Sequence, residues 1–443
     1  MEGRIKAIDM IRGLSIIGMV LCAAYSWDSG LPAFMFHCQE PPPDYAFSPE
    51  VRGITWVDLV FPFFLFSMGA AFPVALGKKL QKGVGQGRIV LGLVRRWVTL
   101  VIFALVIGNS GRIFSSQAPE IWKGVFVVAG WLALFASLVR SARKWVNPCG
   151  YLAVVLLALV EKFIFKVDLS LFTSDIIIMI MAWMALLGGL VWLVSRNSPS
   201  LRLLIFALIL AVKAANSYTG VFGGVGVPDC LGWLFDWGFC QYLLIVIPAT
   251  FVGEILMKEG GKDAGAVAVL IPLLAVLTQL WGLYTRNVAV DFCITAALAV
   301  AYALVCRKNA GKAGIIALAG FSFLIAGIAF DPLDGGIAKD YCNISYLLCT
   351  GGMAGLVTSA LLVAGNRGFK GNVLSLCGQN PMIAYTIVSG LISPVLYACG
   401  LLGLIDSLAT GNMFWGLLRG LIVTGTMCLC TALLTKKKIY WRS

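Results

Sequence analysis

Apolar residues occur along the chain in long runs that short polar stretches separate. Each run of about twenty residues is long enough for a helix to cross the hydrocarbon core of a bilayer. A transmembrane barrel would instead show segments of alternating apolar and polar positions, and this pattern is missing. The sequence therefore predicts an all-α, polytopic transmembrane helical bundle of about 14 spans (12–14). The predicted spans are 8–25, 57–77, 89–108, 121–139, 150–166, 175–195, 202–217, 238–257, 264–284, 290–306, 313–330, 343–364, 373–398 and 413–434.

Polar residues interrupt two of these spans. The run 202–217 is short and carries Lys213, and the run 373–398 contains Gly378 and Pro381. The first span follows basic residues but lacks a small-residue cleavage site, so it is expected to remain in the protein. We interpret 1–443 as a single transmembrane domain whose longest extracytoplasmic loops are 26–55 and 218–237.

Basic residues predict the orientation. With the N-terminus inside, most of the 34 Lys and Arg residues fall on the cytoplasmic side, as the positive-inside rule requires. Both termini are therefore expected to be cytoplasmic. The net charge of +13 indicates contact with anionic membrane lipid, and it is spread over too many loops for a nucleic-acid surface. The basic clusters are Lys78-Lys79-Lys82-Arg88, Arg140-Arg143-Lys144, Arg307-Lys308-Lys312 and Lys436-Lys437-Lys438.

Composition agrees with a membrane protein, because 60% of the residues are hydrophobic and only 12% are charged, about half the usual charged share. A single histidine cannot build a histidine metal site, and no metal-ligand spacing occurs, so no metal is expected. Most of the 13 cysteines lie within spans. Four are placed at the outer side, where an oxidising compartment would allow pairing: Cys38, Cys230, Cys240 and Cys342.

His37, the only histidine, lies in the loop between the first two spans. Histidine titrates near neutral pH, so it suits general-base catalysis. The plainer interpretation is a surface loop residue. Asp58 opens the second span within TWVDLVFPFFLF, and an ionisable group at membrane depth is a functional candidate. It also suits an ordinary helix N-terminus, where the macrodipole favours a carboxylate.

Three arginines near the cytoplasmic side are candidate phosphate ligands, because guanidinium groups bind phosphate well. Arg12 pairs with Asp9 at helical spacing, and Arg95 and Arg96 lie within the third span. An anchoring ion pair and snorkelling to the interface are the alternatives. Asn380 precedes a proline inside the interrupted span. A broken helix there offers an amide and free backbone groups to a ligand, and a simple interhelical hydrogen bond is the alternative.

The motifs RIKAIDMIRGLSI, then a histidine, then GITWVDLVFPFFLFSMG resemble the heparan-alpha-glucosaminide N-acetyltransferase family. The segments GGIAKD, SYLL, GQNPMIAY and KKKIYWRS follow in the same order. The resemblance covers roughly residues 4–77 and 331–443 and is loose between them. It identifies the chain as similar to bacterial members of this family, including proteins labelled as N-acetylglucosamine-related transporters.

The resemblance implies an acetyl-CoA-dependent N-acetyltransferase in the bacterial cytoplasmic membrane. In this family an acetyl group passes from cytosolic acetyl-CoA to an amino-sugar acceptor on the extracytoplasmic side. His37 matches the essential histidine by position, although 16 residues (38–53) separate it from the second motif. Ala23 stands where family members carry an asparagine.

The sequence thus predicts catalytic residues His37 and Asp58, with Arg12, Arg95, Arg96 and Asn380 around acetyl-CoA. Whether His37 acts as a base or carries the acetyl group covalently is left open. A homodimer is also left open. The rival functions are an amino-sugar transporter and an assembly scaffold for envelope polysaccharide synthesis.

Overall fold

The computed structural model describes residues 5–25, 27–140, 143–258, 265–306 and 311–441. It is 76% helical, and the described residues contain no strand, only one bridge between Val139 and Trp441. The long helices are α1 (Lys6–Ala24), α2 (Val60–Gln81), α3 (Gln86–Ser110), α4 (Glu120–Leu138), α5 (Val146–Phe163), α6 (Ile176–Ser195), α7 (Pro199–Thr219), α8 (Leu243–Met257), α9 (Val267–Tyr284), α10 (Val288–Cys306), α11 (Gly311–Phe330), α12 (Ile344–Asn366) and α17 (Met413–Lys436). The shorter helices are α13 (Asn372–Gln379), α14 (Pro381–Ile387), α15 (Ser393–Ala398) and α16 (Leu401–Ala409).

The prediction of an all-α bundle with fourteen spans is confirmed, because 14 helices of the described residues are long and apolar enough to cross a membrane. The run predicted to be short extends over Pro199–Thr219. Ser198 caps it by accepting a hydrogen bond from the Leu201 amide at 3.3 Å, and Pro199 suits the first helical position.

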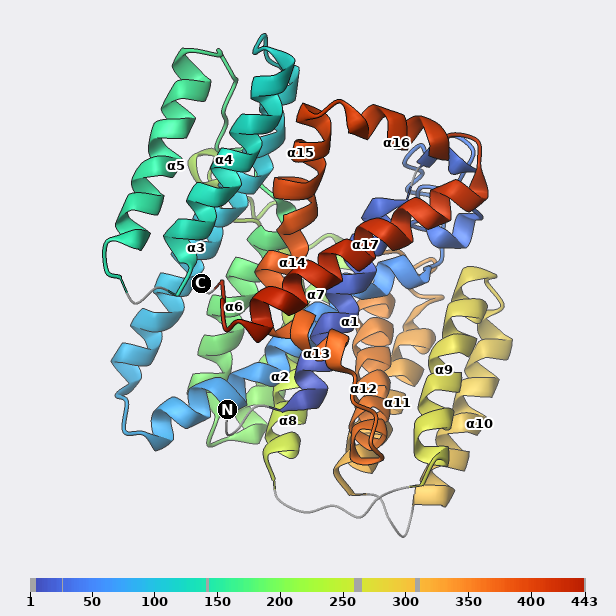
Figure 1. Cartoon of the computed structure of the whole chain (residues 1–443). Helices are drawn as coiled ribbons and strands as arrows, with labels where there is room; N and C mark the ends of the chain where they lie inside the picture. The colour runs from blue at the N-terminus through green and yellow to red at the C-terminus, as the bar shows by residue number, and fades with distance from the viewer. Residues whose placement is uncertain (1–4, 26, 141–142, 259–264, 307–310, 442–443) are drawn as a thin grey trace.

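The interruption predicted in 373–398 is real. Helix α13 ends at Gln379, Asn380 is non-helical at φ −133° and ψ 54°, and Pro381 opens α14. A π-helical turn at Val388–Ile392 then joins α14 to α15. The sequence analysis did not predict α16, which lies across one end of the bundle between α15 and α17 (Figure 1).

Helices α1, α2 and α12 form the centre, with α3–α5 to one side and α9–α11 to the other (Figure 1). The apolar segment of α12 is 78% buried and that of the α2 span is 72% buried, whereas those of α5 and α7 are only 6% buried. Helices α5 and α7 therefore keep most of their apolar side chains on the outside of the bundle, as expected for helices in contact with lipid.

Glycines let α1 and α13 approach backbone to backbone. A Cβ added at Gly13 would lie 1.8 Å from the Leu374 carbonyl oxygen, and one at Gly378 would lie 1.9 Å from the Asp9 carbonyl oxygen. Small residues at such crossings are the usual basis of tight helix packing in membranes. The contact ties the N-terminal helix to the broken helix near the C-terminus.

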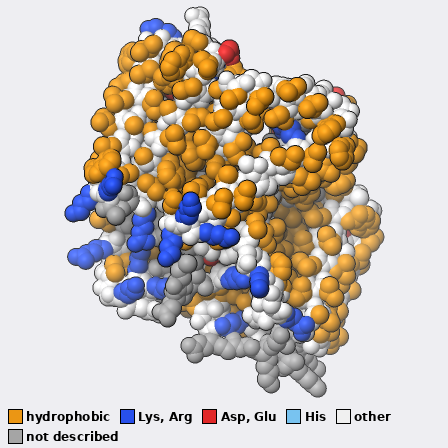
Figure 2. Space-filling model, in the orientation of Figure 1, with side chains coloured by type: hydrophobic (Ala, Val, Ile, Leu, Met, Phe, Trp, Pro, Cys, Tyr) orange, Lys and Arg blue, Asp and Glu red, His pale blue; other side chains and the backbone are white. Residues whose placement is uncertain are grey.

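The two ends of the bundle differ in charge. Lys and Arg side chains gather over the lower part of the molecule in Figure 2, whereas hydrophobic side chains cover most of the rest of this face. We call this the basic end. It includes Lys78, Lys79 and Lys436, which lie in the last turns of α2 and α17. Arg307 and Lys308 of the predicted basic clusters lie outside the described residues. The loop between α1 and α2 lies at the opposite end, which we call the His37 end.

Candidate active site

The loop between α1 and α2 is packed onto the bundle. The rings of Trp27, Phe36 and Tyr45 form a cluster with centroids 4.9–5.4 Å apart. Gln39 is fully buried, and its Nε2 donates to the Gly53 carbonyl at 3.2 Å. The residues between His37 and the second motif are therefore folded into a compact loop, which brings the histidine next to the start of the α2 span.

Asp58 occupies the first turn of that span, and both of its oxygens are used. Oδ2 accepts from the Thr55 backbone amide at 2.9 Å, which completes a capping box. Oδ1 lies 2.6 Å from Nδ1 of His37. The Asp58 side chain is 0% exposed and that of His37 is 28% exposed. Asp58 thus caps the N-terminus of a helix, which was the alternative to a functional role in the sequence analysis. It also pairs with His37.

The pairing fixes the tautomer of the imidazole. A carboxylate can only accept hydrogen bonds, so the proton between the two groups belongs to Nδ1 of His37. The other nitrogen, Nε2, then carries a lone pair. The half-exposed ring can present this lone pair as a proton acceptor, as the histidine of a Ser-His-Asp triad does.

Lys339 completes the centre, and the sequence analysis did not select it. Its Nζ lies 3.2 Å from Nδ1 and 3.4 Å from Nε2 of His37, and 3.9 Å from the carboxylate of Asp340. Since an ammonium group only donates, Lys339 can donate to the lone pair of Nε2. The segment GGIAKD is one of those that carry the family resemblance, but its lysine is indistinguishable in sequence from a surface residue.

The segment that carries Lys339 is rigidly held. Asp331 is buried and forms a bidentate pair with Arg286 at 2.8 Å, and it also accepts from the Ile337 amide at 2.7 Å. The Ile337 carbonyl accepts from the Gly53 amide at 2.8 Å. From α12, the Tyr346 hydroxyl donates to the Asp58 carbonyl at 2.8 Å. The loops before α2 and α12 therefore form one structure around His37.

Cys38 is next to this centre but is a poor nucleophile. It is buried, and burial, reinforced by the negative charge of Asp58, raises the pKa of its thiol to about 12. Only a thiolate reacts readily. Cys38, Cys230, Cys240 and Cys342 are all free thiols, so the pairing considered from the sequence is not formed among them.

Single-cysteine variants test both this burial and the orientation. A membrane-impermeant maleimide added outside intact cells should label exposed Cys230, and should label exposed Cys149 only after permeabilisation. Cys38 should react at least about 10³-fold more slowly than Cys230 at pH 8, because a pKa near 12 leaves roughly one thiol in 10⁴ ionised. The opposite order for Cys230 and Cys149 would reverse the predicted sidedness, and fast labelling of Cys38 would contradict a packed loop.

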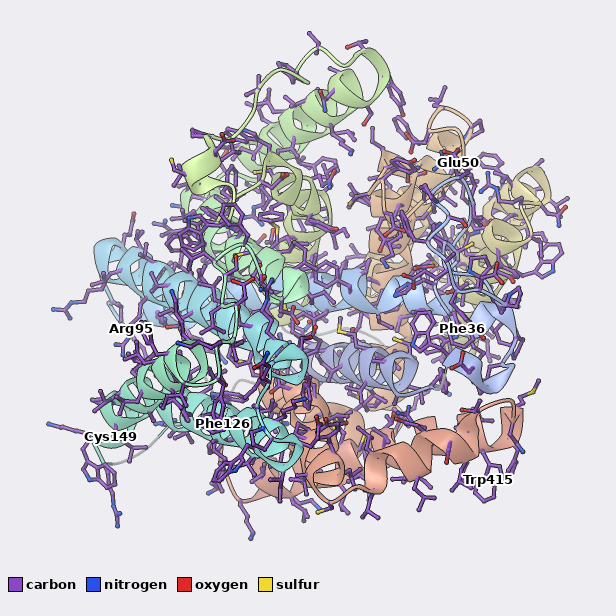
Figure 3. The ribbon with its side chains drawn as sticks, turned by 90° about the horizontal axis from the view of Figure 1, so that it is seen from above. Phe36, Glu50, Arg95, Phe126, Cys149 and Trp415 are labelled. Atoms are coloured by element: carbon purple, nitrogen blue, oxygen red, sulfur yellow. The ribbon has the colours of Figure 1, made fainter. Side chains whose placement is uncertain are left out.

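The three candidate phosphate ligands have different environments. Arg12 is held by Ser67 and by the carbonyl of Gly378, with Asp9 at 3.7 Å. Arg96 is half-buried, and its Nε has no hydrogen-bond partner among the described residues. Arg12 and Arg96 are close enough to influence each other electrostatically. Arg95 is exposed, on the side of the molecule opposite Phe36 and Glu50 of the His37 loop (Figure 3).

Asn380 lies away from His37. It is 0% exposed, its Nδ2 donates to the Ile439 carbonyl at 2.8 Å, and its Oδ1 accepts from the Trp441 amide at 3.1 Å. Both polar atoms of the amide are therefore bonded to the C-terminal segment. The structure brings together His37 and Asp58, places Arg12 within electrostatic range of Arg96, and leaves Asn380 with structural partners.

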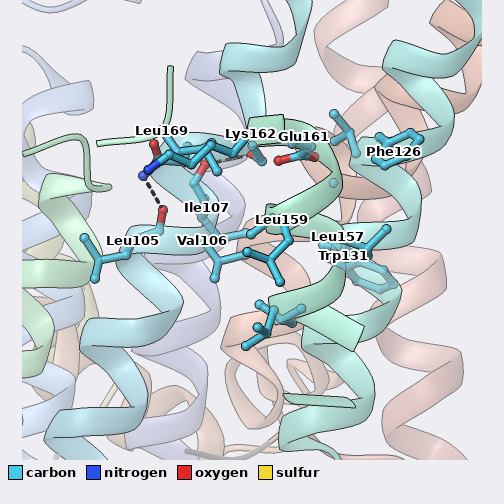
Figure 4. Close-up of a pocket in the computed structure, with 18 of the residues that line it drawn as sticks. Leu105, Val106, Ile107, Phe126, Trp131, Leu157, Leu159, Glu161, Lys162 and Leu169 are labelled. Carbon is cyan, nitrogen blue, oxygen red and sulfur yellow. Dashed lines mark hydrogen bonds between the residues drawn. The ribbon is translucent and has the colours of Figure 1, made fainter. Parts of the chain in front are cut away.

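Two neighbouring cavities lie between the helices. One of about 720 Å³ is lined by α1, α3, α14 and α15 and includes Ala23 and the pair Asp175–Tyr385, whose hydroxyl–carboxylate distance is 3.1 Å. The other, of about 450 Å³, lies among α3, α4 and α5, is mostly apolar, and has Glu161 at its edge (Figure 4). Both cavities include Ile107 and Ser110. His37 lines neither of them.

The fold and this centre define a multi-pass α-helical membrane protein that holds an Asp–His–Lys cluster at one end of its bundle. The chain belongs to the family described as "Domain of unknown function (DUF5009)", whose sequence pattern matches residues 4–256. No curated protein matches the sequence.

Proposed function

We propose that the protein is a transmembrane acyltransferase that passes an acetyl group from cytosolic acetyl-CoA to an amino-sugar acceptor on the other side of the membrane. The observation that supports this most directly is the buried Asp58 carboxylate 2.6 Å from Nδ1 of His37. This arrangement leaves the lone pair on Nε2, at the end of the bundle opposite the basic end, and Nε2 can act as the base once substrate takes the place of Lys339 beside it.

In this reaction His37 must first accept one proton and later give it back. The acceptor nitrogen attacks the thioester carbonyl carbon, and Nε2 of His37 takes a proton from that nitrogen. The tetrahedral intermediate then collapses, the carbon–sulfur bond breaks, and the imidazolium returns its proton to the leaving CoA thiolate. A covalent acetyl-histidine intermediate would divide the same transfer into two steps.

The neighbouring residues have separate roles in this proposal. Asp58 orients the ring and stabilises the imidazolium that forms. Lys339 is a positioning residue in the free protein, where it faces both ring nitrogens. When substrate is bound, its ammonium group can donate to the thioester oxygen as negative charge develops there.

The donor is proposed to bind from the basic end. Arg12 precedes Cys22 by ten residues on α1, a rise of about 15 Å, and Cys22 is within electrostatic range of Lys339 and Asp58. Arg12 and Arg96 therefore lie closer to the basic end than the His37 centre does. Arg96 has an unbonded Nε that suits a phosphate or a pantetheine carbonyl.

Side chains fill the space between the two arginines, Arg12 and Arg96, and the His37 centre. A void of only about 30 Å³ lies below the larger cavity, with Met19 and Tyr385 lining both. Such a void is about the size of one water molecule and has no room for a pantetheine arm. The proposal therefore requires α14 to move relative to α1 when the thioester arm of CoA enters. The adjacent broken helix and its π-helical turn are the segments best suited to this movement.

Arg95 and Arg96 provide a matched test of the donor site. We expect Arg96→Ala to weaken CoA binding by about tenfold or more, because a charged hydrogen bond to phosphate is lost. Arg95→Ala should change the affinity little, since its side chain is exposed. Isothermal titration of CoA into the purified protein measures both. Equal effects, or no effect of Arg96→Ala, would remove Arg96 from the donor site.

Transport of an amino sugar is the alternative, and the broken helix α13–α14 is the observation that favours it, because discontinuous helices commonly form transporter binding sites. Proteoliposomes separate the two functions. An acyltransferase releases CoA and acetylates an amino sugar only when acetyl-CoA is on the side of the basic end. A transporter accumulates labelled sugar without acetyl-CoA. Uptake without acetyl transfer would overturn the proposed function.

A further inference from the structure

A second buried polar cluster lies in the α9–α10 hairpin at one edge of the bundle (Figure 1). Gln279 of α9 and Asp291 and Thr295 of α10 are all 0% exposed, although only 17% of the apolar segment of α10 is buried. Nε2 of Gln279 donates to Oδ1 of Asp291 at 2.8 Å and to Oγ1 of Thr295 at 2.6 Å. Both hydrogens of the amide are thus used.

Two oxygen atoms of this cluster lack a hydrogen-bond partner among the described residues. They are Oε1 of Gln279 and Oδ2 of Asp291, and both are buried. If Asp291 were ionised, both atoms could only accept, so neither could satisfy the other. A buried carboxylate without a cation is also strongly disfavoured. The nearby basic group, Arg286, already has both terminal nitrogens bonded to Asp331 at 2.8 Å.

We propose that Asp291 is a proton-binding site, in which the carboxyl group is neutral and its Oδ2–H donates to Oε1 of Gln279. A single proton then satisfies both remaining oxygens. Together with the Nε2–H donation to Oδ1, it closes a ring of two hydrogen bonds between a carboxylic acid and a primary amide. This inference does not depend on the proposed acyltransferase activity.

The packing around Asp291 is shaped for a carboxyl group. A Cβ added at Gly282 of α9 would lie 2.4 Å from Cγ of Asp291, so only glycine at this position lets the side chain lie against the α9 backbone. Gly282 follows Gln279 by three residues and therefore lies near it on the helix surface. The two helices thus offer a fitted space with one amide as its polar partner.

The charged and titratable groups around the site oppose ionisation of Asp291. Asp331 is within electrostatic range and adds a negative charge, and Cys349 of α12 is also within electrostatic range of Asp291. Helix α9 carries no charged residue, and Lys312, the only one in α11, lies at the far end of that helix. The nearest positive charge, on Arg286, is bonded through both terminal nitrogens to that same Asp331 carboxylate, so it offers no hydrogen bond to Asp291.

The Asp291 site is also connected to the residues that hold the Lys339 segment in place. The Asp291 amide donates to the carbonyl of Asn287, next to Arg286. Arg286 in turn holds Asp331, which accepts from Ile337, two residues before Lys339. A change of charge at Asp291 would therefore act first on the ion pair that anchors the Lys339 segment.

Asp291→Asn tests the proposal, because an asparagine reproduces both bonds of the protonated acid with its own amide. Infrared spectra of the purified protein at neutral pH should show the carbonyl band of a protonated carboxylic acid, and Asp291→Asn should remove it. Asp229→Asn, at an exposed position, is the control and should leave the band unchanged.

Thermal unfolding supplies the second measurement. The folded protein keeps a proton that the unfolded chain releases, so stability falls as pH rises, by up to about tenfold per pH unit in the unfolding equilibrium constant. This dependence should be missing in Asp291→Asn between about pH 4 and 7. The same pH dependence in both proteins, absence of the band, or failure of Asp291→Asn to fold would overturn the proposal. Sodium-dependent stabilisation lost in Asp291→Asn would also overturn it, because the occupant would then be Na⁺.

Discussion

His37→Ala is expected to lower the rate of acetyl transfer by about 10²–10⁴-fold, the usual contribution of a general base, and to leave CoA binding nearly unchanged. The substitution removes the lone pair of Nε2, which no other described group near the centre replaces at neutral pH. CoA binding should persist because Arg12 lies ten residues of α1, about 15 Å, from Cys22, which is within electrostatic range of Lys339 and Asp58. Release of CoA and acetylation of glucosamine, measured separately with purified protein in lipid, give the two readouts.

A second variant separates loss of the base from loss of the fold. His37→Ala leaves the buried Asp58 carboxylate without its 2.6 Å partner, which costs stability. His37→Asn can still donate to Oδ1 of Asp58 from a position close to Nδ1, yet it has no atom at the position of Nε2. Both variants should be inactive, and His37→Asn should be the more stable of the two. Near wild-type acetylation by either one would exclude His37 as the base and favour the transporter.

Asp58→Asn is expected to reduce activity about as strongly, by roughly 10⁴-fold as in other histidine–aspartate pairs. The Thr55 amide needs an acceptor at 2.9 Å, so the asparagine oxygen must take the place of Oδ2. Its NH₂ group then faces Nδ1 of His37 and donates to it. The imidazole proton must move to Nε2, and the lone pair that accepts from substrate is lost.

Asp44→Asn is the matched control for this substitution, because Asp44 is exposed in the same loop and should have near wild-type activity. CoA affinity and the melting temperature of Asp58→Asn should stay close to wild type, since the capping hydrogen bond survives. A wild-type rate for Asp58→Asn would mean that His37 does not need this tautomer.

Hydrophobic patterning predicted the fourteen spans because a bilayer demands long apolar helices whatever the packing between them. The same constraint explains why Asp58 could be recognised: a carboxylate at the start of an apolar run is conspicuous. Its distance from His37 could not be predicted, because the intervening loop gains its shape from the Trp27–Phe36–Tyr45 cluster and from buried Gln39, and not from a repeating pattern.

The environments of several candidate residues could not be predicted from the sequence. Arg95 and Arg96 are equivalent in the motif LVRRWVTLV, but a rotation of about 100° between successive helical positions exposes one and half-buries the other. Asn380 stands beside a proline in a broken span, as expected for a ligand site, yet its amide is bonded to Ile439 and Trp441. Lys339 and Gln279 were missed because only tertiary contacts give them their partners.

The distance along the chain between His37 and Lys339 has a consequence for synthesis. Their contact joins residues 302 positions apart, and a ribosome adds about 5–20 residues per second. His37 and Asp58 are therefore made roughly 15–60 s before the lysine that faces them. During that interval a nascent chain carries the histidine and its carboxylate without Lys339 or the Tyr346 hydroxyl. Only a chain that extends past Tyr346 holds the whole centre, so protein whose translation stops before that residue lacks it.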